Sequence, residues 1–335
     1  MPDRPTIAVL PPRDLCGALF SPESWERLTS LGAVVWNENE RRNLDEEGAK
    51  AILADVDVCI TSWGSPVLTA PVVAAAPKLR LLCHGAGTVK PFVSDALWQR
   101  GIIVTSTAAA IAVSVADAAL AWIIIGARRF LWANATTREG GWKNEMAYPS
   151  SDFYDKRIGI IGASHVGRRM IELLREFRVE IVVYDPYLAA EEALKLGARK
   201  VELDELLRTS DVVSIHAPNT AETRHMLDAR ALALLQDGAT LVNTARGAII
   251  DEAALAQELT TGRIWAILDV TDPEPPAADH PFRRLPNITL TPHIAGCTDR
   301  GRRLIGEYVV EEVSRFIAGK PQRYAMTREM LARIG

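Results

Sequence analysis

The chain has 335 residues, of which 48% are hydrophobic and 24% are charged, so it is long enough for two globular domains and too apolar to be disordered. Its formal net charge of −4 gives no electrostatic basis for binding nucleic acid or a membrane surface, which leaves small molecules as the expected ligands. The four cysteines form no C-x-x-C pair, and Met1 to Arg4 lead into a strand-like run rather than a signal peptide. These features predict a cytoplasmic protein.

The first part of the chain alternates short apolar runs with segments of helical pattern. The runs that are typical of strands occupy residues 6–11, 33–37, 56–63, 79–85 and 102–107. Helical segments lie between them, at residues 22–31, 46–54, 66–76 and 91–100. This alternation predicts βα units around a parallel sheet.

A longer apolar stretch at residues 108–125 has nearly the length of a membrane span. Ser114 and Asp117 interrupt it, and it is rich in alanine, so we expect a buried or dimer-facing helix over residues 113–135. A polar loop that contains Gly140, Gly141 and Trp142 follows and forms the expected hinge region. The apolar surface of this helix and of residues 132–142 needs a partner, which predicts a homodimer.

The second part of the chain repeats the α/β pattern. Strands are expected at residues 157–162, 180–185, 211–218, 239–246, 264–271 and 287–293, with helices such as 166–177 and 252–260 between them. A last helix, 299–318, ends at Gly319 to Pro321, which are helix stop signals. Two α/β domains are therefore predicted in one chain.

The turn at Gly162, Ser164 and Gly167 lies between a β-branched strand and an amphipathic helix, which is the context of a dinucleotide-binding Rossmann crossover. Serine in the middle keeps its backbone N–H and offers a hydroxyl to a phosphate oxygen. Asp185, at the end of the next strand, is placed to accept both ribose hydroxyl protons, which favours NAD. Arg168 and Arg169 leave NADP open, and the alternative is that both glycines only permit tight packing.

Polar side chains end four strands of the second domain, where ligands bind in open α/β sheets. These residues are His216, Arg246, Glu274 and His293. An imidazole exchanges protons near neutral pH, a carboxylate beside it keeps it charged, and a guanidinium grips a carboxylate through two hydrogen bonds. Each residue taken alone could instead be structural. His293 could be an ordinary strand-end histidine, Glu274 a solvated surface acid, and Arg246 a salt-bridging residue. His225 and His280 are expected in exposed loops, and His84, at a strand end of the first domain, is a reserve candidate.

The ordered motifs GIIGASHVG, VVYDPY, HAPNTAETRHML, LVNTARGAIIDEAAL, LDVTDPEP and LTPHIAG resemble those of the D-isomer-specific 2-hydroxyacid dehydrogenases, in a short form without a regulatory domain. The resemblance implies a catalytic trio of Arg246, Glu274 and His293, and no metal. It also implies a cofactor site in which Asp269 binds the nicotinamide carboxamide. The implied cofactor contacts are Gly162, Ser164, His165, Val166, Gly167, Asp185, His216, Ala217, Pro218, Thr223, Thr244, Ala245, Arg246, Asp269, His293 and Gly296.

The same resemblance implies a domain plan. A Rossmann NAD-binding domain, 109–297, is inserted into a flavodoxin-like substrate domain made of residues 1–108 and 298–335, with catalysis in the cleft between them. The loop at His84 to Thr88, with Ala86 and Gly87, offers N–H groups to the substrate carboxylate, and Trp63 faces the cleft. Arg246 and His293 complete the expected substrate contacts.

The expected activity is NAD-dependent reduction of 2-oxo acids, of the glyoxylate or hydroxypyruvate type, to D-2-hydroxy acids, and the reverse oxidation. His293 exchanges the proton, Glu274 holds its imidazole charged, and Arg246 anchors the carboxylate. Two alternatives stay open: an NAD(H)-sensing, corepressor-like binding protein without turnover, and phosphite-type oxidation on the same scaffold. Formate enzymes of this type place glutamine where Glu274 stands.

Overall fold

The computed structural model describes residues 4–145 and 151–334 and divides into two compact α/β units. One unit consists of Met1–Ile111 with Cys297–Gly335, and the other of Ala112–Gly296. The boundaries fall close to those expected at residues 108 and 297, although the first lies inside a helix. The first three residues, on which the argument against a signal peptide partly rested, lie outside the described residues.

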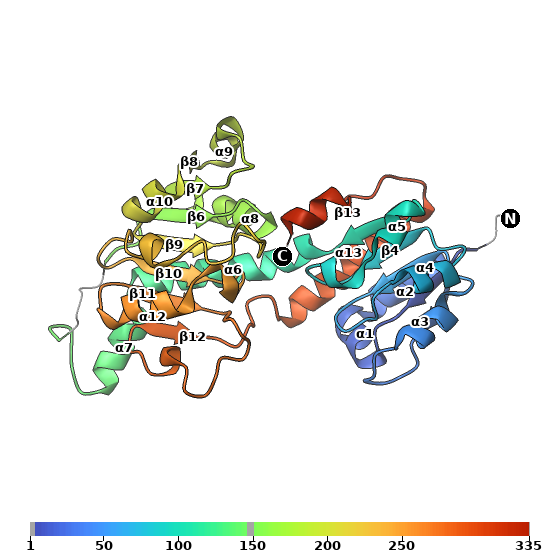
Figure 1. The fold of residues 1–335 in the computed structure, drawn as a ribbon, viewed down its shortest axis with the longest axis horizontal. Coiled ribbons are helices and arrows are strands. Elements are labelled where there is room, and N and C mark those ends of the chain that lie inside the picture. The colour runs from blue at the N-terminus through green and yellow to red at the C-terminus, as the bar shows by residue number, and fades with distance from the viewer. Residues whose placement is uncertain (1–3, 146–150, 335) are drawn as a thin grey trace. The chain divides into compact units, whose positions relative to one another are not determined.

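The first unit is built on a six-stranded sheet with the order β13-β5-β4-β3-β1-β2. Of these strands, β4 and β13 are labelled in Figure 1. Its strands are β1 (Thr6–Val9), β2 (Ala33–Trp36), β3 (Val58–Thr61), β4 (Leu81–His84), β5 (Ile103–Ser106) and β13 (Ala325–Met326). The five strands expected from the sequence are confirmed, and their parallel 2-1-3-4-5 order is that of flavodoxin-like sheets. The two-residue β13 pairs antiparallel with β5 and is too short to be detected from its composition.

Helices cover both faces of this sheet because its strands are apolar on both sides. Ile7 and Val9 belong to one buried cluster, whereas Ala8 and Leu10 belong to another, as the alternation of side chains along a strand requires. The helices are α1 (Arg13–Leu19), α2 (Pro22–Leu31), α3 (Glu46–Leu53), α4 (Ala70–Ala75), α5 (Asp95–Gln99) and α13 (Asp299–Ile317), with short 3₁₀ turns η1 (Lys90–Phe92) and η4 (Glu329–Arg333). The last long helix, α13, packs against α1, α2 and β4 and so closes this unit.

The second unit has a seven-stranded parallel sheet with the order β12-β11-β10-β9-β6-β7-β8. Its strands are β6 (Arg157–Ile161), β7 (Glu180–Tyr184), β8 (Arg199–Lys200), β9 (Val212–Ile215), β10 (Thr240–Asn243), β11 (Trp265–Leu268) and β12 (Ile288–Leu290). The order is that of the Rossmann fold, extended by one strand, with the reversal between β6 and β9. All six expected strands are confirmed, and only the two-residue β8 was not expected.

Two buried clusters flank this sheet. One contains Leu206 of α10 (Leu203–Thr209) and Leu255 of α12 (Glu252–Thr260), and the other contains Ile123 of α6 (Ala108–Ala127) and Met170 of α8 (His165–Leu174). The remaining elements are α7 (Phe130–Arg138), α9 (Ala190–Leu196), α11 (Ala229–Leu232) and the turns η2 (Gly247–Ile249) and η3 (Pro281–Arg283). The predicted helices at 166–177 and 252–260 correspond to α8 and α12.

The single helix expected over residues 113–135 is wrong, because the chain breaks between α6 and α7. Arg129 adopts a left-handed backbone conformation with φ of 60°. Its guanidinium lies 4.1 Å above the ring of Trp265 and donates to Thr240 Oγ1 at 2.9 Å. These tertiary contacts hold Arg129 at the break between α6 and α7, and the local sequence contains no helix stop signal there.

Among the described helices, α6 alone is long and apolar enough to cross a membrane, with a mean hydropathy of 2.2. Core helices of soluble proteins can have the same length and the same mean hydropathy. Ala116, Ala119 and Ile123 of α6 pack against the core of the second unit, yet only 33% of the apolar window is buried. The helix is therefore partly covered and partly exposed.

Candidate functional site

The turn between β6 and α8 needs both of its glycines for backbone reasons. Gly162 has φ of 93°, and a Cβ there would lie 2.6 Å from the backbone nitrogen of Ala217. A Cβ on Gly167 would lie 2.0 Å from the carbonyl oxygen of Gly162. The glycines thus allow the close packing of helix, turn and strand that brings the start of α8 to the carboxyl end of the sheet.

Ser164 occupies the N-cap position of α8, but its hydroxyl does not point to an open phosphate position. It donates to the carbonyl oxygen of His216 at 2.8 Å, which corrects the expectation that this hydroxyl is offered to a phosphate. The helix start still presents backbone N–H groups that have no acceptor within the helix. These N–H groups, rather than the hydroxyl, fit a pyrophosphate.

Asp185 follows β7 and is held by two backbone N–H groups. Its Oδ2 accepts from Ala163 at 2.7 Å, and its Oδ1 accepts from Tyr187 at 2.8 Å. Each carboxylate oxygen keeps a further acceptor position, as two ribose hydroxyls require. The carboxylate therefore lies next to the glycine turn, hydrogen-bonded to Ala163.

The two arginines that left NADP open both have carboxylate partners. Arg168 lies 2.6 Å from Glu192 and also donates to the carbonyl of Ala163 at 3.0 Å. Arg169 lies 2.7 Å from Glu172 on the same helix. Both guanidinium groups are therefore already paired with carboxylates, which does not favour binding of the 2′-phosphate of NADP.

His216 and Thr244 carry buried polar atoms at the ends of neighbouring strands. His216 Nδ1 and Thr244 Oγ1 have no hydrogen-bond partner among the described residues, whereas His216 Nε2 lies 3.0 Å from Ser214 Oγ. Burial lowers the pKa of His216 to about 3, so the ring is neutral and is not an acid–base group at neutral pH. These buried atoms without partners fit a polar cofactor that would form hydrogen bonds with them.

Arg246 stands three residues beyond Asn243, the last residue of β10, and Asn243 fixes its backbone. The buried Asn243 side chain donates to the carbonyl of Arg246 at 2.9 Å and accepts from the N–H of Ala245 at 2.9 Å. Arg246 donates to the carbonyl of Ala245 at 2.7 Å, and among the described residues no carboxylate lies within ion-pair distance of it. Burial lowers the pKa of Arg246, and the charge of Glu274 acts in the opposite direction. A half-buried guanidinium without a counter-ion suits an anionic ligand.

Gly247, directly after Arg246, packs against the backbone of the loop that follows β11. A Cβ on Gly247 would lie 2.1 Å from the carbonyl carbon of Thr271, so the glycine is required by packing against that backbone. The loop after β10 and the loop after β11 therefore touch each other. This contact places Arg246 next to the segment that carries Glu274.

His293 and Glu274 form a hydrogen-bonded pair. His293 Nδ1 lies 2.7 Å from Glu274 Oε2, and both side chains are part-exposed, at 48% and 39%. The other carboxylate oxygen of Glu274 accepts from the N–H of Thr271 at 3.3 Å. His293 has a left-handed backbone with φ of 54°, an uncommon conformation for a residue other than glycine and one that clusters at functional sites. The pair can hold a proton on one ring nitrogen and exchange a proton through the other.

Asp269 fixes the loop that carries His293. Its buried carboxylate accepts from Thr291 Oγ1 at 2.5 Å, from the N–H of Ile294 at 2.9 Å and from the N–H of Ala295 at 2.8 Å. Its carbonyl oxygen accepts from the N–H of His293 at 2.8 Å. Asp269 thus has a structural role in addition to the cofactor contact that the resemblance implied.

In the first unit, hydroxyl groups orient the turn after β4. Ser62 donates to the carbonyl of Gly85 at 2.6 Å, Thr107 to that of Ala86 at 3.2 Å, and Ser106 to that of Gly87 at 2.8 Å. The N–H groups of Ala86 and Gly87, in contrast, have no acceptor among the described residues. Trp63, which follows β3 closely, is 43% exposed.

The reserve candidate, His84, is a core residue. It is fully buried, its Nδ1 lies 2.9 Å from Thr61 Oγ1, and its ring centroid lies 4.6 Å from that of Phe92. Burial lowers the pKa of His84 to about 4, so the ring is neutral near pH 7. The structure favours a role in holding the turn rather than in proton transfer.

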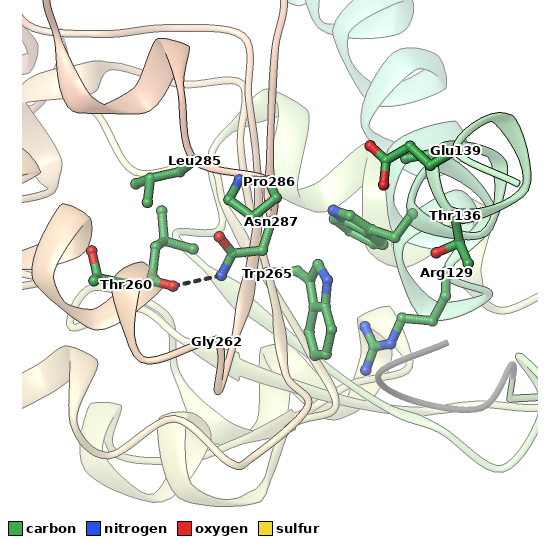
Figure 2. A pocket seen from close by; sticks show the side chains of 12 residues that line it. Arg129, Thr136, Glu139, Thr260, Gly262, Trp265, Leu285, Pro286 and Asn287 are labelled. Atoms are coloured by element: carbon green, nitrogen blue, oxygen red, sulfur yellow. Dashed lines mark hydrogen bonds between the residues drawn. The ribbon is translucent and has the colours of Figure 1, made fainter. Parts of the chain in front are cut away.

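A cavity of about 500 Å³ lies elsewhere in the second unit (Figure 2). Its walls include Trp132 of α7, Trp265 at the start of β11, and Asn287 just before β12. It therefore lies at the amino ends of these strands, whereas the site residues follow the carboxyl ends. This cavity is separate from the candidate site.

Three positions near the site were missed or misplaced by the sequence analysis. Asn243 and Thr291 hold the Arg246 and His293 loops, and the motifs that contain them, NTARG and LTPHIAG, were the available signal. His280, expected in an exposed loop, has a side chain only 19% exposed and contacts Glu252. His225, in contrast, is exposed as expected.

The fold and this site define a two-unit α/β protein with a dinucleotide-binding turn and a histidine–carboxylate pair at the carboxyl edge of the same sheet. Residues 120–295 match the family model described as "D-isomer specific 2-hydroxyacid dehydrogenase, NAD binding domain". The chain belongs to the D-isomer-specific 2-hydroxyacid dehydrogenase family and carries its NAD binding domain, which confirms the resemblance noted in the motifs.

Relatives of comparable length match most of the chain. It is 35% identical to a glyoxylate reductase of Korarchaeum cryptofilum over 79% of this chain and 81% of the relative. It is 33% identical to a hydroxypyruvate reductase of Thermotoga maritima over 81% of this chain and 88% of the relative. The crystal structure of a glyoxylate reductase from Paecilomyes thermophila superposes with a TM-score of 0.78 at 26% identity, covering 98% of this chain and all of that one. The chain also matches D-3-phosphoglycerate dehydrogenases, of which it spans about half the length, 49% in Archaeoglobus fulgidus.

Proposed function

We propose that this protein is an NAD-dependent D-2-hydroxyacid dehydrogenase that reduces 2-oxo acids to D-2-hydroxy acids and catalyses the reverse oxidation. The observation that carries the proposal is the 2.7 Å contact between His293 Nδ1 and Glu274 Oε2, on a loop beside Arg246. Family membership supports the D configuration and the class of reaction. The contacts of the site supply a chemical role for each of the three residues.

His293 is the proposed acid and base. NADH, when bound, would supply the hydride that is added to the carbonyl carbon of the 2-oxo acid. His293 Nε2 donates a proton to the carbonyl oxygen, which becomes the hydroxyl of the product, and it accepts that proton in the oxidation direction. Glu274 accepts from Nδ1–H, fixes the tautomer and stabilises the imidazolium by its opposite charge.

Arg246 is the proposed anchor of the substrate carboxylate. Its guanidinium presents a planar fork of donors that matches a carboxylate through two parallel hydrogen bonds. Its position in a half-buried site without a carboxylate of the described residues at ion-pair distance supports this role. The same charge polarises a neighbouring carbonyl toward hydride addition.

The residues of the glycine turn are proposed to hold NAD in preference to NADP. Backbone N–H groups at the start of α8 fit the pyrophosphate, and Asp185 fits the ribose hydroxyls. A 2′-phosphate beside the Asp185 carboxylate meets like-charge repulsion, and Arg168 and Arg169 are paired with glutamates. His216, Ala217, Pro218, Thr223, Thr244, Ala245, Asp269 and Gly296 complete the proposed cofactor contacts.

In the first unit, we propose that the N–H groups of Ala86 and Gly87 bind the substrate anion. Two observations support this proposal: the three hydroxyl groups fix the turn through its carbonyl oxygens, and these two N–H groups have no acceptor among the described residues. Trp63, with 43% of its surface exposed, is proposed to limit the size of the substrate. Small 2-oxo acids of the glyoxylate and hydroxypyruvate type are therefore the first candidates, as the names of two relatives also suggest.

We further propose a homodimer in the cytoplasm. Only 33% of the apolar window of helix α6 is buried, and Phe130 and Trp142 nearby are 49% and 65% exposed. The cavity lined by Trp132 and Trp265 belongs to the same part of the second unit, and a second copy is its proposed occupant (Figure 2). The four free cysteines, three of them buried, suit a reducing compartment.

The test is consumption of NADH and NADPH by the purified protein with a panel of 2-oxo acids. We expect NADH-dependent turnover of at least one small 2-oxo acid, and its loss in His293→Ala. Binding of NADH without turnover across the panel would contradict the proposal and favour an NAD(H)-sensing protein.

A further inference from the structure

A second histidine–carboxylate contact lies outside the catalytic pair. His280 Nε2 is 3.2 Å from Glu252 Oε2, and the two side chains are only 19% and 11% exposed. Glu252 is the first residue of α12, and His280 immediately precedes η3. Neither residue has a role in the activity proposed above, although both are better buried than His293 and Glu274.

The hydrogen bonds of His280 fix its ring. Its Nδ1 accepts from the N–H of Phe282 at 3.3 Å, so Nδ1 carries no hydrogen and the ring hydrogen lies on Nε2. The ring also packs edge-on against Phe282, with 4.6 Å between centroids, and Phe282 is 2% exposed. A ring fixed in this way donates to Glu252 Oε2 and orients that carboxylate.

The second oxygen of Glu252 holds the segment that carries Glu274. Glu252 Oε1 accepts from the N–H of Asp272 at 2.8 Å. One residue earlier, the N–H of Thr271 donates to Glu274 Oε1, and Thr271 Oγ1 donates to the carbonyl of Pro273 at 2.9 Å. Glu252 is thus attached to a four-residue turn, Thr271 to Glu274, whose last side chain binds His293.

The surroundings of Glu252 disfavour its ionised form. The pKa of Glu252 is raised to about 7, mainly by burial; the N–H of Asp272 lowers it, and the neighbouring carboxylates of Asp272 and Glu274 add to the rise. Arg224 lies 3.2 Å from Asp272 and offsets part of the negative charge. Perturbed carboxylates of this kind concentrate at functional sites.

We propose that Glu252 is a positioning residue: oriented by His280, its carboxylate holds the N–H of Asp272 and thereby fixes the turn that presents Glu274 to His293. This inference rests on the proposed function, in which Glu274 is the partner of the proton-exchanging histidine. Glu252 itself touches neither His293 nor Arg246 in any contact of the described residues. Its effect on turnover passes through the backbone of the turn.

Two substitutions separate the hydrogen bond from the charge. Glu252→Gln removes the charge and keeps one oxygen that can accept from Asp272, but its NH2 group then faces the ring N–H of His280, so that contact is lost. Glu252→Asp keeps the charge but is one methylene shorter, so it withdraws the acceptor. We expect Glu252→Asp to lose about tenfold in kcat with an unchanged KM for NADH, and Glu252→Gln to stay within about twofold of the unsubstituted protein.

The matched control is Glu258→Gln on the same helix. Glu258 is 16% exposed and pairs with Arg263 at 2.6 Å, so it has similar burial and a cationic partner but no contact with the turn. We expect Glu258→Gln to keep full kcat even if it lowers the melting temperature. A purely structural role of Glu252 would affect the melting temperature in the same way and leave kcat unchanged.

The second readout does not depend on turnover. We expect the hydrogen on His293 Nδ1, bound to Glu274, to give a downfield proton resonance in NMR, which its loss in Glu274→Gln would assign. We expect this resonance to disappear in Glu252→Asp through faster exchange and to persist in Glu252→Gln and Glu258→Gln. Persistence in Glu252→Asp, or equal loss in both Glu252 variants, would overturn the inference. If the unsubstituted protein reduces no 2-oxo acid, the proposed function fails, but the resonance still decides this inference.

Discussion

Nδ1 of His293 lies 2.7 Å from Oε2 of Glu274, and the backbone of His293 has φ of 54°. Asp269 holds that backbone through its carbonyl oxygen and binds the two following N–H groups through its carboxylate. The histidine is therefore fixed from two sides, through its ring and through its main chain. Nε2 lies on the other side of the ring from Glu274, has no hydrogen-bond partner among the described residues, and is the proposed atom for proton exchange.

Replacing this histidine should remove acid–base catalysis while leaving cofactor binding intact. We expect His293→Ala to lower kcat by about 10²- to 10⁴-fold, the usual contribution of a positioned acid–base group. The dissociation constant for NADH, measured by fluorescence titration, should change little. An equal loss of NADH binding would indicate damage to the loop rather than removal of the acid.

Replacing the proposed carboxylate anchor should impair the enzyme even when its charge is kept. We expect Arg246→Lys to lower kcat/KM by about 10- to 100-fold, because an ammonium group cannot make two parallel hydrogen bonds to one carboxylate. Steady-state kinetics with the best 2-oxo acid provide the measurement. Kinetics near those of the unsubstituted protein would show that the guanidinium fork does not grip the substrate.

Asp185 should set the choice between NADH and NADPH. We expect Asp185→Ser to raise the ratio of NADPH to NADH activity, because it removes the negative charge beside the 2′ position while keeping a polar side chain. The ratio of kcat/KM for the two cofactors is the measurement. An unchanged ratio would contradict the proposed contact, since no other carboxylate follows β7 directly.

Acid should destabilise the fold through buried His216. The unfolded ring takes up a proton near its ordinary value of 6.5, whereas the folded ring, with its pKa lowered to about 3, does not. Between these values the unfolded state binds more protons, so the free energy of unfolding falls as pH falls, by at most about 1.4 kcal/mol per pH unit for this group.

The measurement is urea unfolding of the protein and of His216→Gln between pH 7 and pH 4.5. The variant lacks the titrating ring, so its stability should fall less steeply with acid. The raised pKa of Glu252 has the opposite effect, because it makes the free energy of unfolding rise as pH falls from about 7 to 4.5. Glu252 is present in both proteins, so its contribution is the same in both and does not affect their difference. Parallel pH dependences would show that the ring of His216 is not buried as a neutral group.

The exposed aromatic residue of the loop after α7 should matter for self-association. We expect Trp142→Ser to shift the proposed dimer toward monomer in sedimentation equilibrium. Leu194→Ser is the matched control, because Leu194 is 67% exposed against 65% for Trp142 but lies on α9. Monomeric behaviour of the unsubstituted protein, or an equal shift in both variants, would contradict the proposed interface.

Much of the fold could be predicted from the sequence because its elements are coded locally. A strand such as Trp265–Leu268 is a short apolar run, buried at every position. The glycine turn at Gly162 and the acid at Asp185 were recognised because their spacing follows from the strand, turn and helix that they join. Two-residue strands such as Arg199–Lys200 have no such local signal.

The amino-acid sequence by itself determined the two α/β units, the family and the identity of the residues at the strand ends, because these depend on short patterns in fixed order. Only the tertiary structure decided which groups meet. It placed Arg129 against Trp265 and so broke a helix, packed Gly247 on Thr271, and paired His280 with Glu252. The physical reason is that these contacts join segments distant in the chain, and their burial and hydrogen bonds exist only once the sheet has brought the loops together.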